Sequence, residues 1–203
     1  IWKDVPGMLN ADPKFFSDTV KLDSISFKEA IELAYYGASV IHPKTIKPLQ
    51  NKNIPLHVKS FIEPVKEGTL IQESTEFDHL VPSFIFKMNQ VLFSIIPKDF
   101  SFLVEENLSH IFRVLSEAGA KINMMQNSAL SFSFALDQEQ TDIQHIFKLF
   151  KDDFSVRFNE DLELLTIRHY DQETIDRLTL DKDLLVEQKT RQTVRFLMKK
   201  RSL

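Results

Sequence analysis

The sequence predicts an α+β protein: a segment of mixed helices and strands, followed by two βαββαβ units of which the second is abbreviated. Three observations support this fold class. Helix-like and strand-like patterns alternate up to residue 72, as they do in domains that mix both elements. Shorter elements in the order β-α-β-β-α-β follow a polar linker. A stretch near the C-terminus then repeats several landmarks of that unit.

The composition limits the possible classes of protein. With 203 residues, the chain can hold one large or two small domains that each bury a core. No apolar run approaches the roughly 20 residues of a membrane span, and the absence of cysteine excludes a disulfide framework and suits a cytoplasmic protein. The formal net charge of −4, with dispersed lysines and arginines, does not predict nucleic-acid binding. Because the chain begins with Ile1-Trp2 rather than with methionine or a signal peptide, we expect a fragment of a longer protein.

The stretch Ser26–Pro43 predicts a helix, a glycine turn and a short connector. Ser26 and Glu29 form a capping box, in which the serine accepts an unpaired backbone N–H and the glutamate reaches back to the cap. Gly37 can adopt the left-handed conformation that ends a helix, and His42-Pro43 stops the connector. Apolar residues at i, i+3, i+4 and i+7 give the helix one buried face: Phe27, Ala30, Ile31 and Ala34.

The remaining elements before the linker are short. We expect a second helix over Lys44–Asn51, a strand over Pro55–Phe61 and a last strand that ends at Ile71. A polar, acidic stretch follows, which is typical of a linker. The predicted organisation is a first domain segment over 1–72, a linker over 73–83, a first βαββαβ unit over 84–160 and a second, shortened unit over 161–203.

The first βαββαβ unit combines strands with amphipathic helices. From Leu130 to Leu136, apolar residues alternate with small ones, as in a half-buried strand. This order of elements is that of the ferredoxin-like arrangement, a four-stranded antiparallel sheet with two helices on one face. The expected strands are 87–96, 120–126, 130–136 and 154–158, and the expected helices are 105–118 and 139–150.

The second unit is a shorter copy. Ser94 and Asp99 of the first unit parallel Thr166 and Asp171, and Gln126-Asn127-Ser128 parallels Gln188-Lys189-Thr190. Because this copy lacks a final helix and strand, it cannot close its own sheet, and we expect it to lean on the first copy or on a partner chain. Its expected elements are strands 162–170, 184–188 and 193–198 and a helix over 172–178.

Three strings of the sequence together resemble the aspartate kinases: IWKDVPGMLNADPK at 1–14, SFKEAIELAYYGASVIHP at 26–43 and KINMMQNSALSFSF at 121–134. In that family the first string is a loop that lines the ATP site, and the second ends the catalytic domain. The third belongs to paired ACT domains, which bind an amino acid and report it to the catalytic domain. The resemblance implies the C-terminal piece of an α/β amino-acid-kinase domain followed by ferredoxin-like βαββαβ ACT units.

The resemblance also implies a nucleotide-binding set. Asp4 would lie near the base and ribose, and Lys14, in place of the usual arginine, would bring a cation to the phosphates without the two-point grip of a guanidinium. Ser39 stands where relatives have a lysine, which should weaken binding of a polyphosphate. Ordinary turn chemistry on a surface loop is the alternative interpretation of residues 1–14. The complete set is Lys3, Asp4, Leu9, Asp12, Pro13, Lys14, Ser39 and Val40.

A second set implied by the resemblance would bind the amino-acid effector. An effector of this kind offers an ammonium and a carboxylate, so its pocket needs both oxygen acceptors and N–H donors. Asn123 would meet the amine or side chain of the effector, and the helix N-terminus near Leu108 would seat the carboxylate. The alternative is a polar hairpin bend. Many lysine-sensitive relatives have aspartate at Asn123, so lysine and threonine both stay open. The set is Leu108, Ile122, Asn123, Gln126, Asn127 and Ser128.

By this resemblance the parent protein is a cytoplasmic, ATP- and Mg²⁺-dependent aspartate kinase. It would transfer phosphate to the aspartate β-carboxylate at the head of lysine, threonine and methionine synthesis, and it would form a homodimer through its ACT domains. We expect no catalytic residue in this piece, no bound cofactor and no activity without the N-terminal lobe. The six histidines lack the spacing of a helical metal pair, and no metal site is expected. The alternative is a non-catalytic amino-acid-sensing or dimerisation module with a vestigial kinase segment.

Overall fold

The computed structural model describes residues 1–38 and 41–200. It divides into two compact units that do not follow the order of the sequence. Of the described residues, unit 1 comprises Ile1–Phe86 and Leu165–Phe196, and unit 2 comprises Lys87–Leu164 and Leu197–Lys200. These units group residues by proximity and differ from the linear ranges expected above, which stay a prediction. None of the helices in the described ranges is long and apolar enough to span a membrane.

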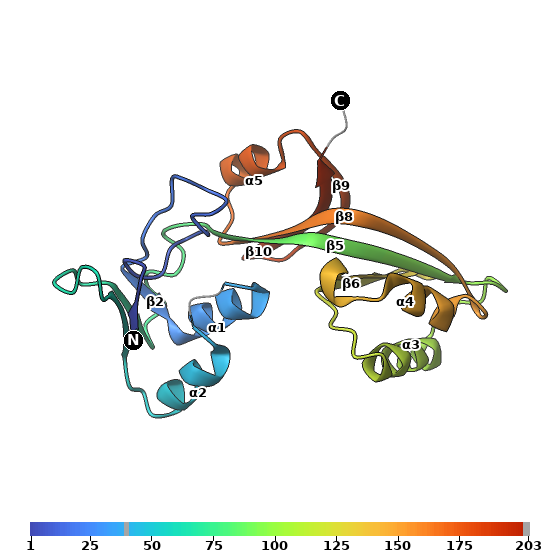
Figure 1. Cartoon of the computed structure of the whole chain (residues 1–203), viewed down its shortest axis with the longest axis horizontal. Helices are drawn as coiled ribbons and strands as arrows, with labels where there is room; N and C mark the ends of the chain where they lie inside the picture. Colours follow the sequence, from blue (N-terminus) through green and yellow to red (C-terminus); the bar gives the residue numbers. More distant parts are fainter. Residues whose placement is uncertain (39–40, 201–203) are drawn as a thin grey trace. The chain divides into compact units, whose positions relative to one another are not determined.

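The N-terminal part of unit 1 is a small α/β arrangement (Figure 1). Strands β1 (Trp2–Lys3), β2 (Ser24–Ser26), β3 (Leu56–Ser60) and β4 (Thr69–Gln72) form a sheet in the order β1-β3-β4-β2. The pairs β1–β3 and β2–β4 are parallel, and β3–β4 is antiparallel. Helices α1 (Phe27–Tyr36) and α2 (Pro43–Asn51) pack on it, which confirms both expected helices to within a residue or two. The core of this part consists of Met8, Leu22, Ile25, Phe27, Ala30, Leu33, Ile41, Ile46, Val58 and Ile71.

Helix α1 begins as expected, but half of the predicted capping box is wrong. The Ser26 hydroxyl accepts the backbone N–H of Glu29 at 2.9 Å. The backbone N–H of Ser26, however, donates to Asp78 Oδ1 at 2.7 Å, and its hydroxyl donates to Asp78 Oδ2 at 2.6 Å. Asp78 lies in the stretch expected to be only a linker. The Glu29 carboxylate therefore does not bond to the cap and instead bonds to Arg168 and His169.

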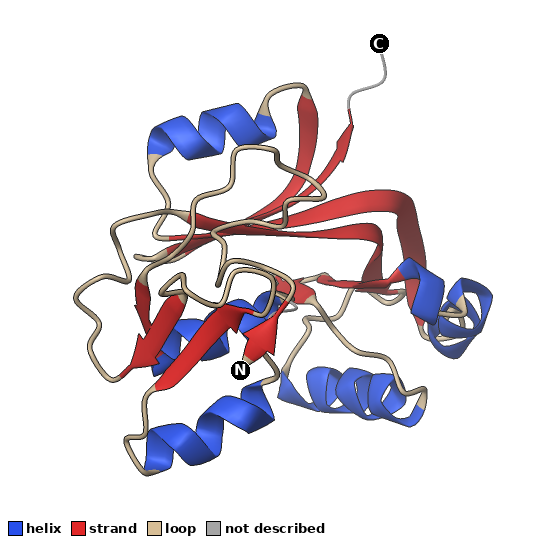
Figure 2. Ribbon diagram, turned by 60° about the vertical axis from the view of Figure 1, so that its left-hand side comes forward, coloured by secondary structure: helices blue, strands red, loops and turns tan. Residues whose placement is uncertain are grey.

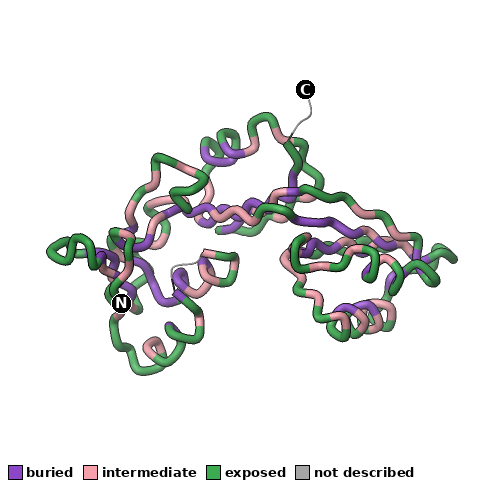
Figure 3. The backbone as a smooth tube through the Cα atoms, viewed as in Figure 1, coloured by how far each residue is buried: buried purple, intermediate pink, exposed green. Residues whose placement is uncertain are grey.

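Unit 2 has the ferredoxin-like arrangement, as expected (Figure 1). It contains β5 (Ser83–Pro97) from Lys87 onward, α3 (Glu105–Glu117), β6 (Met124–Asn127), β7 (Phe132–Asp137), α4 (Ile143–Phe150) and β8 (Phe154–Arg168) up to Leu164. The strand order β6-β7-β5-β8 is the ferredoxin-like order of second, third, first and fourth strands. Figure 3 shows that buried residues concentrate along these strands. One apolar core joins both helices to one face of the sheet through Val91, Phe93, Ile95, Ile111, Leu115, Phe134, Ile146 and Phe150.

Several expected boundaries are wrong. Strand β5 begins at Ser83 rather than at residue 87, and its Phe84 N–H donates to the Asn10 carbonyl. Strand β6 begins at Met124 rather than at residue 120. Helix α4 begins at Ile143, where Asp142 caps it by accepting the His145 N–H at 2.9 Å. The strands expected at 154–158 and 162–170 are one continuous strand, β8, and Figure 2 shows it beside the equally long β5.

The internal repeat is confirmed at its hairpins. After β8 follow α5 (Gln172–Thr179), β9 (Lys182–Lys189) and β10 (Thr193–Lys200), with the strand order β8-β10-β9. The Ser128 N–H donates to the Ser131 carbonyl at 2.8 Å, and the Thr190 N–H donates to the Thr193 carbonyl at 2.8 Å. In both bends the hydroxyl accepts the N–H three residues later, at 3.1 Å. Because β8 ends one copy and begins the other, the shortened copy shares a strand instead of standing alone.

Candidate functional site

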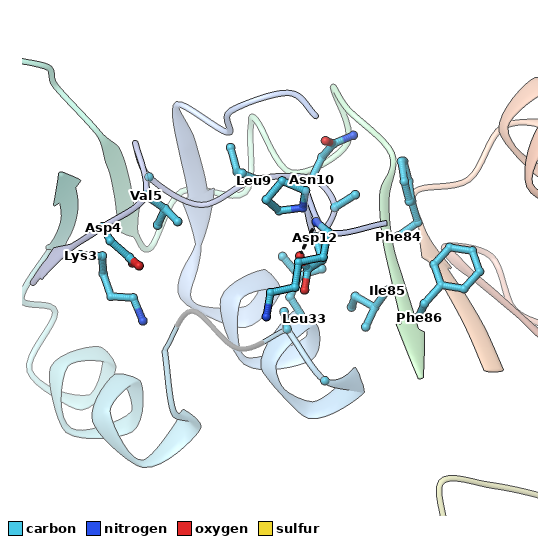
Figure 4. A pocket seen from close by; sticks show the side chains of 16 residues that line it. Lys3, Asp4, Val5, Leu9, Asn10, Asp12, Leu33, Phe84, Ile85 and Phe86 are labelled. Atoms are coloured by element: carbon cyan, nitrogen blue, oxygen red, sulfur yellow. Dashed lines mark hydrogen bonds between the residues drawn. The ribbon is translucent and has the colours of Figure 1, made fainter. Parts of the chain in front are cut away.

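A cavity of about 290 Å³ lies in unit 1, and Figure 4 shows the side chains around it. The loop after β1 forms one side, the C-terminal end of α1 contributes Leu33, Gly37 and Ala38, and the first residues of β5 form the remaining wall. Its lining residues from the loop are Lys3, Asp4, Val5, Gly7, Leu9, Asn10, Ala11, Asp12, Pro13 and Lys14, and those from β5 are Phe84, Ile85 and Phe86.

Asn10 fixes the loop against two other segments. Its side chain is buried, its Oδ1 accepts the Val20 N–H at 2.7 Å, and its Nδ2 donates to the Pro82 carbonyl at 3.1 Å. Its carbonyl accepts the Phe84 N–H at 2.8 Å. A buried amide with all of these bonds satisfied holds its neighbours in one arrangement. The loop and the start of β5 are therefore held together as one continuous wall of the cavity.

Gly7 allows the loop to approach strand β4 closely. It has a φ of +156°, and a Cβ added there would lie 2.5 Å from Thr69 Oγ1. The Thr69 hydroxyl accepts the Met8 N–H at 2.8 Å and donates to the Leu22 carbonyl at 2.5 Å. Further along the loop, Asp12 Oδ1 accepts the Lys14 N–H at 2.9 Å and so forms a tight turn. These contacts set the backbone that carries the charged side chains.

The structure brings together all six described members of the expected nucleotide set. Lys3, Asp4, Leu9, Asp12, Pro13 and Lys14 all line the cavity. Ser39 and Val40 lie outside the described residues, and the segment that leads to them, Gly37-Ala38, lines the cavity as well. Nucleotide binding by this set stays a prediction.

Sequence reasoning missed the contribution of β5 and of α1. Leu33 was not among the residues expected to be important, and residues 84–86 were expected to begin another domain. The available signal was weak: Phe84-Ile85-Phe86 is an apolar run directly after the polar linker. Chemically, the cavity offers an apolar surface from Leu9, Leu33 and Ile85, and its loop adds two lysines and two aspartates. This combination suits a ligand that has a flat apolar part, hydrogen-bond donors for the aspartates and anionic groups for the lysines.

The expected effector residues lie in unit 2 but do not all face the same way. Gln126 and Asn127 are consecutive residues of β6, so their side chains point to opposite faces of the sheet. Asn123 is engaged within the unit: its Nδ2 donates to Gln90 Oε1 at 2.8 Å, and its Oδ1 accepts from Lys87 Nζ at 2.8 Å. Leu108 and Ile122 pack against the core, and the Ser128 and Ser131 hydroxyls lie 2.7 Å apart. Effector binding by this set stays a prediction.

Unit 1 also contains a buried charged cluster that sequence reasoning missed. The Glu29 carboxylate accepts from Arg168 Nη2 at 2.5 Å and from Arg168 Nε at 3.1 Å, and His169 Nε2 lies 3.0 Å from it. Arg168 Nη1 donates to Thr193 Oγ1 at 2.6 Å. Burial alone raises the pKa of Glu29, but the bonds from His169 and Arg168 outweigh it, so this pKa lies below its ordinary value. The cluster ties α1 to the ends of β8 and β10.

The comparisons with known proteins agree with this architecture. Residues 1–60 match the model of the amino acid kinase family. The chain is 33% identical over 138 residues to lysine-sensitive aspartokinase 3 of Escherichia coli, a match that covers 68% of this chain and 30% of the relative. It is 32% identical over 142 residues to chloroplastic aspartokinase 3 of Arabidopsis thaliana, covering 68% of this chain and 24% of that protein. The chain thus spans about a quarter to a third of the curated relatives that it matches.

Two solved aspartate kinases share the fold. Aspartokinase III of E. coli, crystallised with aspartate and ADP, superimposes with a TM-score of 0.77 at 24% identity, covering 97% of this chain and 47% of that one. Aspartate kinase of Clostridium acetobutylicum gives a TM-score of 0.84 at 21% identity, and the match covers 98% of this chain and 50% of that one. Residues 1–60 are a segment of the amino acid kinase family, as the family model shows. More narrowly, the chain belongs to the aspartate kinase family and corresponds to the C-terminal part of these proteins.

Proposed function

We propose that the whole protein is an aspartate kinase, which transfers the ATP γ-phosphoryl group to the β-carboxylate of L-aspartate. The observation that carries this proposal is the cavity, because six residues expected from sequence to contact nucleotide line it together. The E. coli relative of the same fold was crystallised with aspartate and ADP. The pathway and cytoplasmic location expected from sequence belong to the same proposal.

The residues of the cavity fit part of a nucleotide. Its volume of about 290 Å³ is at the lower end of ligand pockets, so it suits the base and ribose, while the phosphates would extend along the lysines. ATP with Mg²⁺ supplies the phosphoryl group when bound, and the metal neutralises charge on the phosphates. Lys14 would add a cation on the protein side, and Asp4 would accept hydrogen bonds from the base or ribose.

The chain by itself is expected to bind nucleotide without turning over aspartate. Phosphoryl transfer depends on positioning both substrates, and this chain spans about half of the solved kinases, 47% and 50%. The test is aspartate-dependent ATP consumption by the whole protein, with the acyl phosphate trapped by hydroxylamine. Trapped aspartyl hydroxamate would support the proposal. Its absence, with the protein folded and ADP bound, would contradict it.

The second part of the proposal concerns regulation. We propose that unit 2 binds an amino-acid effector, lysine or threonine, with the expected set around Asn123. A structural relative was crystallised with lysine and aspartate, and it shares the fold with a TM-score of 0.75. Occupation by the effector would exchange the bonds from Asn123 to Gln90 and Lys87 for bonds to the ligand. A homodimer through the ACT units is part of the same proposal.

A thermal-shift series with lysine, threonine and methionine tests the regulatory part. A ligand that binds the folded state raises the melting temperature, and an Asn123→Ala variant should lose that shift. If neither the chain nor the whole protein responds to any of the three, the proposed effector site is wrong.

A sensor without kinase activity is the second candidate. The sequence has Ser39 where relatives carry a lysine at the nucleotide, and loss of that cation favours this candidate. An amino-acid response in the whole protein without any trapped acyl phosphate would establish it.

A further inference from the structure

We propose that Ile85, at the start of strand β5, is a nucleotide-contact residue that forms the apolar wall for the base. This inference rests on the proposed nucleotide role of the cavity. It adds a segment that lies outside the residues 1–60 matched by the kinase family model. The strand therefore contributes to a kinase ligand site as well as to the ferredoxin-like sheet, because β5 extends from Ser83 to Pro97.

Figure 4 shows Ile85 on the cavity side of β5, turned toward the loop and Leu33, whereas Phe86 lies on the other side of the strand. This follows from strand geometry, since consecutive side chains point to opposite faces. Ile85 is half-buried and packs at the edge of the apolar cluster that contains Leu33. A half-buried isoleucine facing an apolar cavity can gain burial when a flat ligand enters.

The backbone around Ile85 is held from both sides. On one side the Phe84 N–H donates to the Asn10 carbonyl at 2.8 Å. On the other, Phe16 packs against Phe84 with ring centroids 4.6 Å apart and against Phe86 at 5.4 Å. The residues before and after Ile85 are thus clamped to the loop that carries the charged members of the cavity. Such support is what keeps a contact residue within reach of its ligand.

The apolar base of an adenine nucleotide would contact Ile85, which points toward Leu33 in Figure 4. Asp4 lies farther from Ile85 and would accept hydrogen bonds from the ribose, and the lysines of the loop would meet the phosphates. Ile85 would therefore contact the base, and its loss would leave recognition of a bare polyphosphate unchanged.

The test measures binding of a fluorescent ADP analogue to the 203-residue chain, with ADP and tripolyphosphate as competitors. For Ile85→Ala we expect ADP to compete about tenfold more weakly, because a few methylene groups in an apolar pocket are worth at least that factor. Tripolyphosphate should compete as before. Ile85→Val should keep most of the ADP affinity, and Ile85→Phe should weaken ADP by filling the cavity.

Ile96→Ala is the matched control, since Ile96 is a half-buried isoleucine on the same strand and belongs to unit 2. Ile96→Ala should lose about as much stability as Ile85→Ala, while ADP should compete with the analogue as strongly as it does in the unaltered chain. Lys14→Met separates the two proposals, because it should weaken both competitors. If Lys14→Met weakens binding and Ile85→Ala does not, the assignment of Ile85 is overturned while the nucleotide site stands. If the unaltered chain binds neither competitor, the nucleotide role and the assignment both fall.

Discussion

Replacement of Arg168 by methionine should strongly destabilise unit 1. The Arg168 side chain is 7% exposed, the Glu29 carboxylate that it pairs with is 4% exposed, and the guanidinium makes two bonds to it. Arg168→Met keeps an unbranched side chain of similar length but leaves the carboxylate buried with the His169 ring as its remaining side-chain partner. Thr193 Oγ1 also loses its donor.

The expected cost is about 3–5 kcal/mol, the range found when one member of a buried ion pair is removed. Most of it is the desolvation of a carboxylate whose compensation has gone, rather than the attraction between the two groups. With a urea m-value of roughly 2 kcal/mol per molar, the unfolding midpoint should fall by roughly 2 M. The second acidic neighbour, Glu32, lies 3.9 Å from Arg168 and is 36% exposed, so it contributes little.

Urea unfolding followed by circular dichroism measures this change. Lys66→Met is the control, because it breaks an ion pair of 2.8 Å to Glu63 whose members are both about half exposed. This control should cost less than about 1 kcal/mol. In the double variant Glu29→Leu/Arg168→Met no unpaired charge is left, and it should recover much of the lost stability. A free energy of unfolding of Arg168→Met within about 1 kcal/mol of that of the unaltered chain would contradict the view that the buried pair with Glu29 stabilises unit 1.

Three further predictions follow from local geometry. The folded-state pKa of Glu29 lies below its ordinary value of 4.5, so the stability that its carboxylate contributes is present above pH 4.5 and is lost as the pH falls through the lower folded pKa. Free energies of unfolding measured against pH should show this loss, and Glu29→Gln should make the free energy depend less on pH. Gly68→Ala should lower the free energy of unfolding by more than about 1 kcal/mol, because φ is +77° and the new Cβ would overlap the Val58 carbonyl. Gly119→Ala is the control for the same thermal melt: φ is +68°, but a Cβ there would meet no neighbouring atom, so the loss should be smaller. Thr69→Val should lower the free energy of unfolding by about 1–3 kcal/mol and weaken binding of the ADP analogue, because the loop loses its hydrogen bonds to the Thr69 hydroxyl. An unchanged affinity would show that these bonds do not support the nucleotide site.

Much of the fold could be predicted from local patterns. The apolar face of α1, the alternation of β7 and the repeated hairpin bends of the two copies are each properties of a few neighbouring residues, and the structure confirms them. The ferredoxin-like order followed from the sequence of elements. The loop residues of the cavity were also within reach, because they occupy one continuous string.

The rest depends on contacts between residues far apart in the chain. The Glu29 carboxylate fits a local capping rule, yet it pairs with Arg168, which lies 139 residues away. Asp78 takes over at the cap from within an expected linker. Near the start of strand β5, the Phe84 N–H donates to Asn10, more than seventy residues upstream. No local pattern encodes such pairings, and for that reason Ile85 could not be placed in the cavity from sequence.

Photo-crosslinking with 8-azido-ADP, followed by mass spectrometry of the labelled peptides, locates the nucleotide most directly. We predict saturable labelling of the peptides that contain residues 3–14 or Ile85, suppressed by excess ADP and reduced by Lys14→Met. Labelling confined to unit 2, or labelling that ADP does not suppress, would contradict a nucleotide site in this cavity.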